Sequence, residues 1–331
     1  MLLNKYIVIY FLFLFSSLAI SLLSATVGLK TILKWRSDQT SETRRLLENK
    51  LYLCRSAMFV GASVRVIMAP LWFLMLQSLI PLVPGAMCLA GVHLAVPVYS
   101  WLASAMKLLL PLFYFTWIII EMADRKIMAQ PFLKFRHLFL MVVIIAVLAE
   151  TFLDIKYLLA VKPVNVTCCT ALFDMGSDNI PPLLTESHWY FVIAFVLALV
   201  VQTVYLLRPR KEKMAFLLII ILALILFITL PLGLHTQLSP LLLDAPFHHC
   251  IFCLLQNNFF ILAGGGVSLL AIYFSFAYGL IGFIGNDKEG QAQIRGFLKK
   301  VRLISLFLSA AGFSLLLIPV LSYFYQNQGG I

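Results

Sequence analysis

Long apolar runs alternate with short polar segments along the whole chain. Eight of these runs have about the length that a helix needs to cross the hydrocarbon core of a bilayer, which is roughly 20 residues. We therefore predict an all-α integral membrane protein, a bundle of eight transmembrane helices that forms a single domain over residues 1–331. The predicted spans are 6–29, 58–81, 96–120, 138–160, 189–207, 214–234, 258–284 and 303–324.

The composition supports a membrane protein and argues against a soluble one. Hydrophobic residues make up 62% of the 331 positions, charged residues make up 12%, and the mean hydropathy is +0.98. A soluble fold of this composition could not cover its own apolar surface, whereas a lipid bilayer removes that need. The net charge of +11 does not indicate nucleic-acid binding, because the basic residues form short clusters between apolar runs rather than an extended basic face.

The basic clusters occupy every second connecting segment. Such segments stay on the cytoplasmic side, so we expect both termini and the alternate segments to lie outside the cytoplasm, with the protein in the cell (inner or plasma) membrane. The first run also has features of a secretory signal peptide, but the seven basic residues that follow it favour a retained helix. The clusters are Lys30, Lys34, Arg36, Arg44, Arg45, Lys50 and Arg55; Arg125, Lys126, Lys134 and Arg136; Arg208, Arg210, Lys211 and Lys213; and Lys288, Arg295, Lys299, Lys300 and Arg302.

Cysteine and histidine gather at the predicted extracytoplasmic side. The sharpest motif is His248-His249-Cys250-Ile251-Phe252-Cys253, in which two cysteines three positions apart can place both sulfurs on one side of a turn. This spacing suits a reversible disulfide or a metal chelate, and a protonated histidine beside Cys250 would favour its thiolate. The residues on this side are Cys88, Cys168, Cys169, Cys250, Cys253, His93, His188, His235, His248 and His249.

The first of three functional hypotheses is thiol–disulfide redox chemistry at these cysteines. The thiolate of Cys250 or Cys253 would attack a disulfide of a partner, and the other cysteine, or Cys168 and Cys169, would resolve the mixed disulfide. Electrons would pass to or from a membrane quinone or an extracytoplasmic thioredoxin-like protein.

The second hypothesis is soft-metal handling, which means binding, transport or metal-site assembly of copper or zinc, with a metal-carrying protein as partner. The third is a non-catalytic membrane subunit of a larger complex, in which disulfides staple the outer loops. If all disulfides were structural, the odd number of five outer cysteines would leave one thiol unpaired. This slightly favours the redox and metal hypotheses over the structural one. The candidate metal ligands are His248, His249, Cys250, Cys253, Cys88 and His93.

Ionisable residues inside the predicted spans form a second candidate site. Lys107 lies near the middle of the third span and Glu150 near the middle of the fourth, at similar depth because the two spans are antiparallel. Asp154 follows Glu150 by one turn on the same helix face. A charge inside the membrane needs a partner, so we predict a Lys107–Glu150 pair, which Arg65 of the second span could join. The pair would serve a proton path or a polar cavity, or would lock the helices together.

Three further expectations concern packing. Trp72, Trp101, Tyr99, Trp117, Trp189 and Tyr190 are expected mainly at the membrane interfaces, and a minority of such aromatic groups line quinone sites. The run Gly264-Gly265-Gly266 favours close helix packing. The last basic segment is expected to be a solvated connection.

Overall fold

The structure is a computed structural model, and it describes residues 4–34, 41–125, 133–162, 166, 189–207, 212–245, 248–285 and 288–327. This part of the chain is almost entirely helical and contains no strand. Eight of its helices are long and apolar enough to cross a membrane. The prediction of an all-α integral membrane protein with several spans is therefore confirmed, whereas the orientation of the termini stays a prediction.

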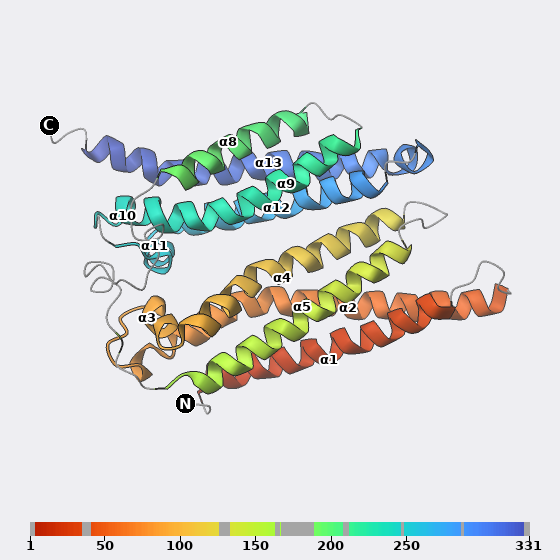
Figure 1. Ribbon diagram of the computed structural model, residues 1–331, viewed down its shortest axis with the longest axis horizontal. Helices are drawn as coiled ribbons and strands as arrows, with labels where there is room; N and C mark the ends of the chain where they lie inside the picture. The colour runs from red at the N-terminus through yellow and green to blue at the C-terminus, as the bar shows by residue number, and fades with distance from the viewer. Residues whose placement is uncertain are drawn as a thin grey trace. The chain divides into compact units, whose positions relative to one another are not determined.

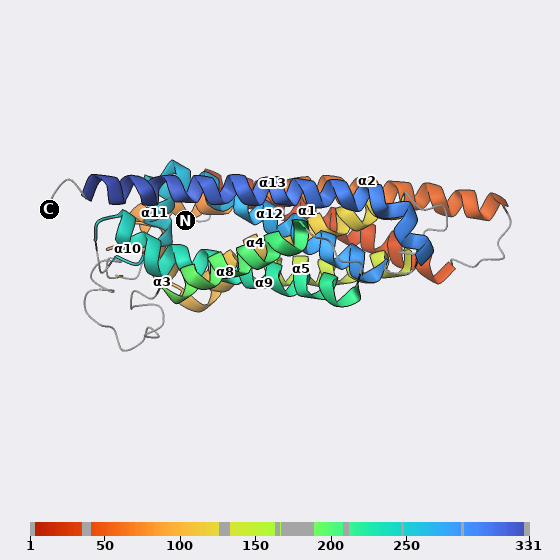
Figure 2. The ribbon, with the colours of Figure 1, turned by 90° about the horizontal axis from the view of Figure 1, so that it is seen from above.

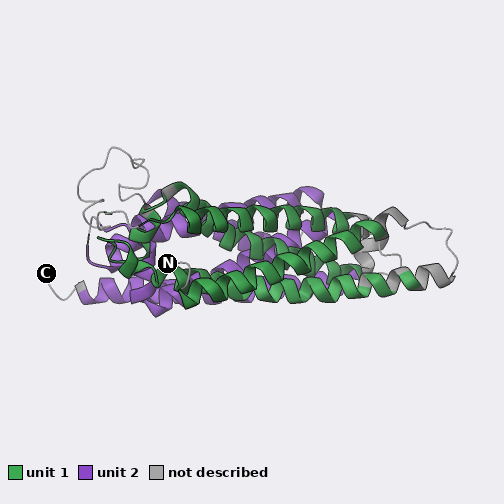
Figure 3. Ribbon diagram, turned by 90° about the horizontal axis from the view of Figure 1, so that it is seen from below, with its two compact units in different colours: residues 1–166 green, residues 167–331 purple. Residues whose placement is uncertain are grey.

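Contacts divide the chain into two compact units, residues 1–166 and residues 167–331 (Figure 3). The described part of each unit contains four long helices, and consecutive long helices are antiparallel (Figure 1). The single domain expected from the sequence stays a prediction.

In unit 1, each long helix packs against the next, and the last packs back against the first, so the four close a ring. Two short helices interrupt the connection between the second and third long helices. The long helices are α1 (Lys5–Lys34), α2 (Ser41–Gln77), α4 (Pro97–Asp124) and α5 (Leu133–Ala160), and the short ones are η1 (Ile80–Leu82) and α3 (Leu89–Leu94).

Unit 2 repeats this plan. Its long helices close a ring in the same neighbour order, and short helical pieces again fill the connection between the second and third. A duplication of this kind is not visible in the sequence by eye. The long helices are α8 (Tyr190–Leu207), α9 (Lys213–Gly233), α12 (Phe259–Ile284) and α13 (Lys288–Asn327), and the short pieces are the π-helical η2 (Leu234–Leu238), α10 (Ser239–Leu242) and α11 (Ile251–Asn257).

Two helices extend well beyond the predicted spans. α2 begins at Ser41 rather than near residue 58, and α13 begins at Lys288 rather than near residue 303. The last basic segment is helical, because α13 runs through it from Lys288 (Figure 2), and its expected role as a solvated connection stays a prediction. Apolar periodicity marks how much of a helix lies in lipid, and charged residues such as Lys299 and Lys300 are good helix formers that continue the helix into water.

Each unit has its own apolar core. In unit 1, Trp117 packs with Met58, Tyr114 and Val143, and in unit 2 Leu226 packs with Leu254. Trp72 and Trp117 are 0% and 3% exposed inside the bundle, and their expected depth near a membrane interface stays a prediction. Both rings face other helices of unit 1 rather than the lipid boundary.

Candidate functional site

The two cysteines of the His-His-Cys-x-x-Cys motif lie at the start of α11 in unit 2. Cys250 is the residue just before the helix and has an extended backbone, and Cys253 lies in the first turn. Their sulfur atoms are within 4.8 Å of one another. Cys250 is buried and Cys253 is partly exposed. The spacing therefore does bring the two thiols to one side of a turn, as the sequence predicted.

A serine hydroxyl fixes the backbone of this motif. Ser239, the first residue of α10, accepts a hydrogen bond from the Cys250 N–H over 2.9 Å. The same hydroxyl lies 3.0 Å from the carbonyl oxygens of Cys250 and His248, to either of which it can donate its proton. Ser239 is fully buried, so its contacts hold the start of α11 against α10 without competition from water.

His249 precedes the thiol pair and faces the π-helical turn η2. Its ring centroid is 6.3 Å from that of His235, which lies in that turn. Burial lowers the pKa of His249, and the backbone carbonyls of Thr236 and His235 oppose that shift. The imidazole is therefore neutral at neutral pH, which is the form that ligates metals. A neutral His249 does not supply the positive charge that would favour the Cys250 thiolate.

The expected metal ligands Cys88 and His93 belong to unit 1. His93 lies in the last turn of α3 and is fully buried, and burial lowers its pKa to about 4. Trp72 Nε1 lies 3.2 Å from Ser104 Oγ, and Ser104 Oγ lies 2.8 Å from His93 Nε2. Since the Leu89 carbonyl, 3.0 Å from Nδ1, can only accept, the proton of the neutral ring sits on Nδ1, and the Ser104 hydroxyl donates to Nε2. Both ring nitrogens thus have protein partners, and a metal would have to displace one.

The remaining predicted thiols, Cys168 and Cys169, lie outside the described residues. The residue described closest before them is Val166, whose N–H donates to the Pro84 carbonyl over 3.0 Å. This contact requires a glycine at position 85, which has φ of 82° and where a side chain would collide with the Val166 carbonyl. Within the described part of the chain, Cys54, Cys88, Cys250 and Cys253 form no disulfide.

The predicted intramembrane ion pair is present in unit 1. Lys107 Nζ donates to Glu150 Oε1 and to Asp154 Oδ2, each over 2.6 Å. Arg65 pairs with the other oxygen of Glu150, so three long helices of unit 1, namely α2, α4 and α5, are joined by one network. Tyr10 of α1 donates to Asp154 Oδ2 over 2.5 Å. The functional role of these residues stays a prediction.

A second charge cluster in unit 1 was not predicted from the sequence. It lies at the end of α4 where the basic segments join the helices, away from the Lys107 network. Glu121 is 1% exposed and pairs with Arg136 over 2.6 Å, with Arg125 over 3.1 Å, and with Arg55. Arg136 also pairs with Asp124 over 3.0 Å. The basic residues were interpreted only as topology signals. The sequence did contain a signal for this cluster. Glu121 and Asp124 are three positions apart, so both acids lie on one helix face, where basic residues of the neighbouring segments can pair with them.

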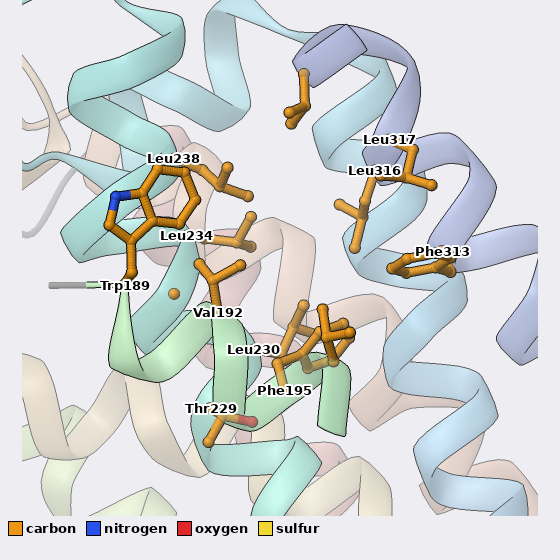
Figure 4. Close-up of a pocket in the computed structure, with 13 residues that line it drawn as sticks. Trp189, Val192, Phe195, Thr229, Leu230, Leu234, Leu238, Phe313, Leu316 and Leu317 are labelled. Atoms are coloured by element: carbon orange, nitrogen blue, oxygen red, sulfur yellow. The ribbon is translucent and has the colours of Figure 1, made fainter. Parts of the chain in front are cut away.

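Unit 2 also contains an apolar cavity of about 130 Å³ between α8, the α9–η2 segment and α13 (Figure 4). Trp189, Leu234 and Phe313 line it, together with Thr229, whose hydroxyl donates to the Ile225 carbonyl over 2.8 Å. None of the lining residues, all in the described part of unit 2, is ionisable. The cavity can hold apolar atoms, but it supplies no acid, base or nucleophile.

No family model, curated protein or solved structure matches this chain. Its chemistry has to be inferred from the residues themselves. They offer a dithiol in unit 2 and a buried charge network in unit 1.

Proposed function

We propose that Cys250 and Cys253 form a redox-active dithiol on the extracytoplasmic side of an integral membrane protein of the cell membrane. The single observation that carries this proposal is the approach of the two sulfurs to within 4.8 Å at the start of α11, with unequal burial. A rotation of the side chains can bring the sulfurs to the roughly 2.05 Å of a disulfide, because the residues are adjacent on one turn. The partly exposed thiol can meet a partner, and the buried one can resolve the product.

The reaction is a two-electron exchange in which atoms balance. The Cys253 thiolate attacks one sulfur of a partner disulfide, which gives a mixed disulfide and releases the other partner sulfur as a thiolate. The Cys250 thiolate then attacks the Cys253 sulfur, so a Cys250–Cys253 disulfide forms and the partner leaves as a dithiol. The reverse direction oxidises the partner. An extracytoplasmic thioredoxin-like protein is the partner class that suits this exchange.

A membrane quinone is the alternative electron acceptor. In that case the dithiol becomes the disulfide, and the quinone takes both electrons and two protons to become the quinol. Ser239 supports either version, because it holds the Cys250 backbone and so fixes one end of the pair while the Cys253 side chain turns towards it.

Soft-metal binding is the second candidate. It is favoured by one observation, that the sulfurs of Cys250 and Cys253 lie close enough to bind one ion. The neutral imidazole of His249 precedes them in the chain, but its ring lies beside that of His235 and would have to turn to join them. Copper(I) and zinc both accept mixed sulfur and imidazole ligands. A thiol pair leaves places for ligands from other sources, such as a metal-carrying protein.

The experiment that tests the proposal is alkylation mass mapping of the native protein in a series of defined redox buffers, with elemental analysis of the same sample. We expect Cys250 and Cys253 to pass together from alkylated to protected as the potential rises, in a single two-electron transition. Replacement of Cys253 by serine should trap the partner as a mixed disulfide only if Cys250 can also be reached. Replacement of Cys250 should trap it readily.

Cys54→Ser is the matched control, because Cys54 belongs to unit 1, is buried there, and its thiol donates to the Ser24 carbonyl over 3.1 Å. It should leave the transition unchanged. About one copper or zinc ion per chain, with both thiols protected until a chelator is added, would instead establish the metal site. Bonds that resist reductant until the protein unfolds, including bonds to Cys168 or Cys169, would show a stapled subunit of a larger complex and would refute both chemical proposals.

A further inference from the structure

Unit 1 contains a charge network that the thiol chemistry does not use. Arg65, Lys107, Glu150 and Asp154 are each 2% exposed or less, and they lie within segments long and apolar enough to span the membrane. We propose that this network is an intramembrane proton-binding site and that Asp154 is the group that takes up and releases the proton. The proposal concerns unit 1 alone, so it stands or falls independently of the dithiol in unit 2.

The two acids of the network are not equally compensated. Each oxygen of Glu150 has its own cation, Lys107 at Oε1 and Arg65 at Oε2. Asp154 has only a share of Lys107, and it receives that amine and the Tyr10 hydroxyl on the same oxygen, Oδ2. Because a buried carboxylate is stabilised by the donors that face it, Glu150 is the better stabilised anion of the two.

The second oxygen of Asp154 is where a proton can be added. Among the described residues, no donor reaches Oδ1 of Asp154, although the residue is 0% exposed. A proton on that atom leaves the contacts of Oδ2 with Lys107 and Tyr10 in place. A proton on Glu150 would have to displace a contact with Arg65 or with Lys107. The lowest-cost site for one additional proton is therefore Asp154 Oδ1.

The surroundings of Lys107 allow the network to hold the extra positive charge. With all four groups ionised, two cations balance two anions, and one bound proton leaves a net charge of +1. The Lys107 amine lies 4.8 Å from the Trp72 ring centroid and 5.2 Å from the Tyr10 ring centroid. The negative faces of these aromatic rings attract a desolvated ammonium group, so Lys107 keeps partners when Asp154 becomes neutral.

The titratable and charged groups around Asp154 come from every helix of the unit 1 ring. Tyr10 faces it from α1, Lys107 from α4 and Glu150 from one turn earlier on α5, while Arg65 of α2 acts through Glu150. Asp154 lies six residues before the end of α5 at Ala160, which corresponds to about 9 Å along the helix. A proton from water at that end has less of the bundle to cross to reach Asp154 than to reach Glu150.

Infrared difference spectroscopy of the full-length protein in lipid nanodiscs tests this inference. We expect acidification to produce the carbonyl stretching band of a protonated, dehydrated carboxyl group, and expect the band to shift in heavy water. Protein made with aspartate labelled with carbon-13 at the side-chain carboxyl should shift the same band, whereas labelled glutamate should not. This comparison identifies the residue type in the unaltered protein, so it does not depend on any variant folding.

Variants then identify the position. Asp154→Asn should abolish the band, and Asp124→Asn, which alters the fully buried aspartate of the other charge cluster, should leave it unchanged. Asp154→Glu keeps a carboxyl group at the site and should transfer the band from the aspartate label to the glutamate label. The proposal is overturned if no band arises before the protein unfolds in acid, if the band follows the glutamate label in the unaltered protein, or if it persists in folded Asp154→Asn.

Discussion

The two units share a helix order and each has an apolar core, but they differ in the polar side chains that they bury. Unit 1 joins its helices with ion pairs at mid-span, in which Lys107 bridges Glu150 and Asp154. The described part of unit 2 buries no Lys, Arg, Asp or Glu side chain, and neutral groups join its helices instead. The Gln202 amide donates to Ser275 Oγ over 2.6 Å, and Ser275 Oγ lies 2.6 Å from Ser305 Oγ.

Unit 2 brings its helices together by small residues instead. On α12, Gly264, Ser268, Gly279 and Gly282 recur at helical spacing, and a side chain added at the first would meet the backbone of Leu316. Close approach of this kind is the common way to pack helices in lipid, where apolar side chains gain nothing by leaving the solvent. The same ring of four helices can therefore be stabilised by buried ion pairs or by close packing at small residues. The charged version is costly unless every partner is in place, which points to a use for the charges in unit 1.

Lys107→Met should produce the largest loss of stability. It leaves two carboxylates buried with one arginine, and removing one partner of a buried pair costs about 3–5 kcal/mol. Reversible unfolding in mixed detergent micelles measures the effect. Lys107→Met combined with Glu150→Gln restores one cation for one anion and should recover part of the loss. If Lys107→Met lowered the free energy of unfolding by less than a surface ion pair contributes, the buried charges would not distinguish unit 1 from unit 2.

Acid should destabilise unit 1 through His93. Because its pKa is about 4 in the folded protein, against 6.5 for an exposed histidine, the unfolded chain binds the proton more tightly. The stability that neutral His93 contributes is complete above pH 6.5 and is lost as the pH falls towards 4, by about 3 kcal/mol. Unfolding at a series of pH values checks this, and His93→Gln should flatten the profile over that interval. A profile that is unchanged in the variant would show that His93 is not the group responsible.

Neighbouring glycines of unit 2 should respond differently to the same substitution. Gly264→Ala would place a methyl group 3.0 Å from both the backbone nitrogen and Cγ of Leu316, and overpacking of this kind costs about 1–3 kcal/mol. Gly266→Ala meets nothing within 4 Å and serves as the matched control. It should be neutral or should stabilise α12 by up to about 1 kcal/mol. Equal effects of the two substitutions would argue against close packing as the reason for this glycine run.

Gln202→Leu should have the smallest effect. Interhelical hydrogen bonds between neutral groups in membrane proteins contribute about 0.6 kcal/mol on average. The same unfolding measurement applies, with Thr203→Val as a control, because the Thr203 hydroxyl donates within its own helix, to the Leu199 carbonyl over 2.7 Å. A loss comparable to that of Lys107→Met would mean that the two interiors differ less than their charges suggest.

The sequence predicted the features that depend on depth in the membrane. The eight spans followed from apolar length, and the Lys107–Glu150 pair followed from two charges at similar depth on antiparallel spans. It did not predict the structure of the polar segments beyond the apolar spans. The continuation of α13 to Lys288 and the cluster of Glu121 with Arg136 both lie where polar sequence is compatible with helix, loop or salt bridge, so only the tertiary contacts decide.

The candidate sites show the same division. The Cys-x-x-Cys spacing was sufficient to predict that two sulfurs share one side of a turn, because that geometry is local. The role of Ser239 was not predictable, since it lies eleven positions before Cys250, whose backbone it holds. The burial of Trp72 against Lys107 was missed for a related reason. Periodicity shows which residues share a helix face, but not which neighbouring helix that face meets.

The length of α13 has a mechanical consequence. Its 40 residues correspond to about 60 Å, roughly twice the thickness of the hydrocarbon core, and the proline inside it, Pro319, lies beyond Gly312 as counted from the basic end. A helix of this kind is stiff in torsion, so a turn applied to the basic segment near Lys299 rotates Ser305 and Gly312 by a similar angle. Because Gly312 lies against the Ser268 backbone, that rotation meets resistance from α12 within a fraction of a turn. Rotation of the basic part of α13 is thus coupled directly to the packing of α13 against α12 inside unit 2.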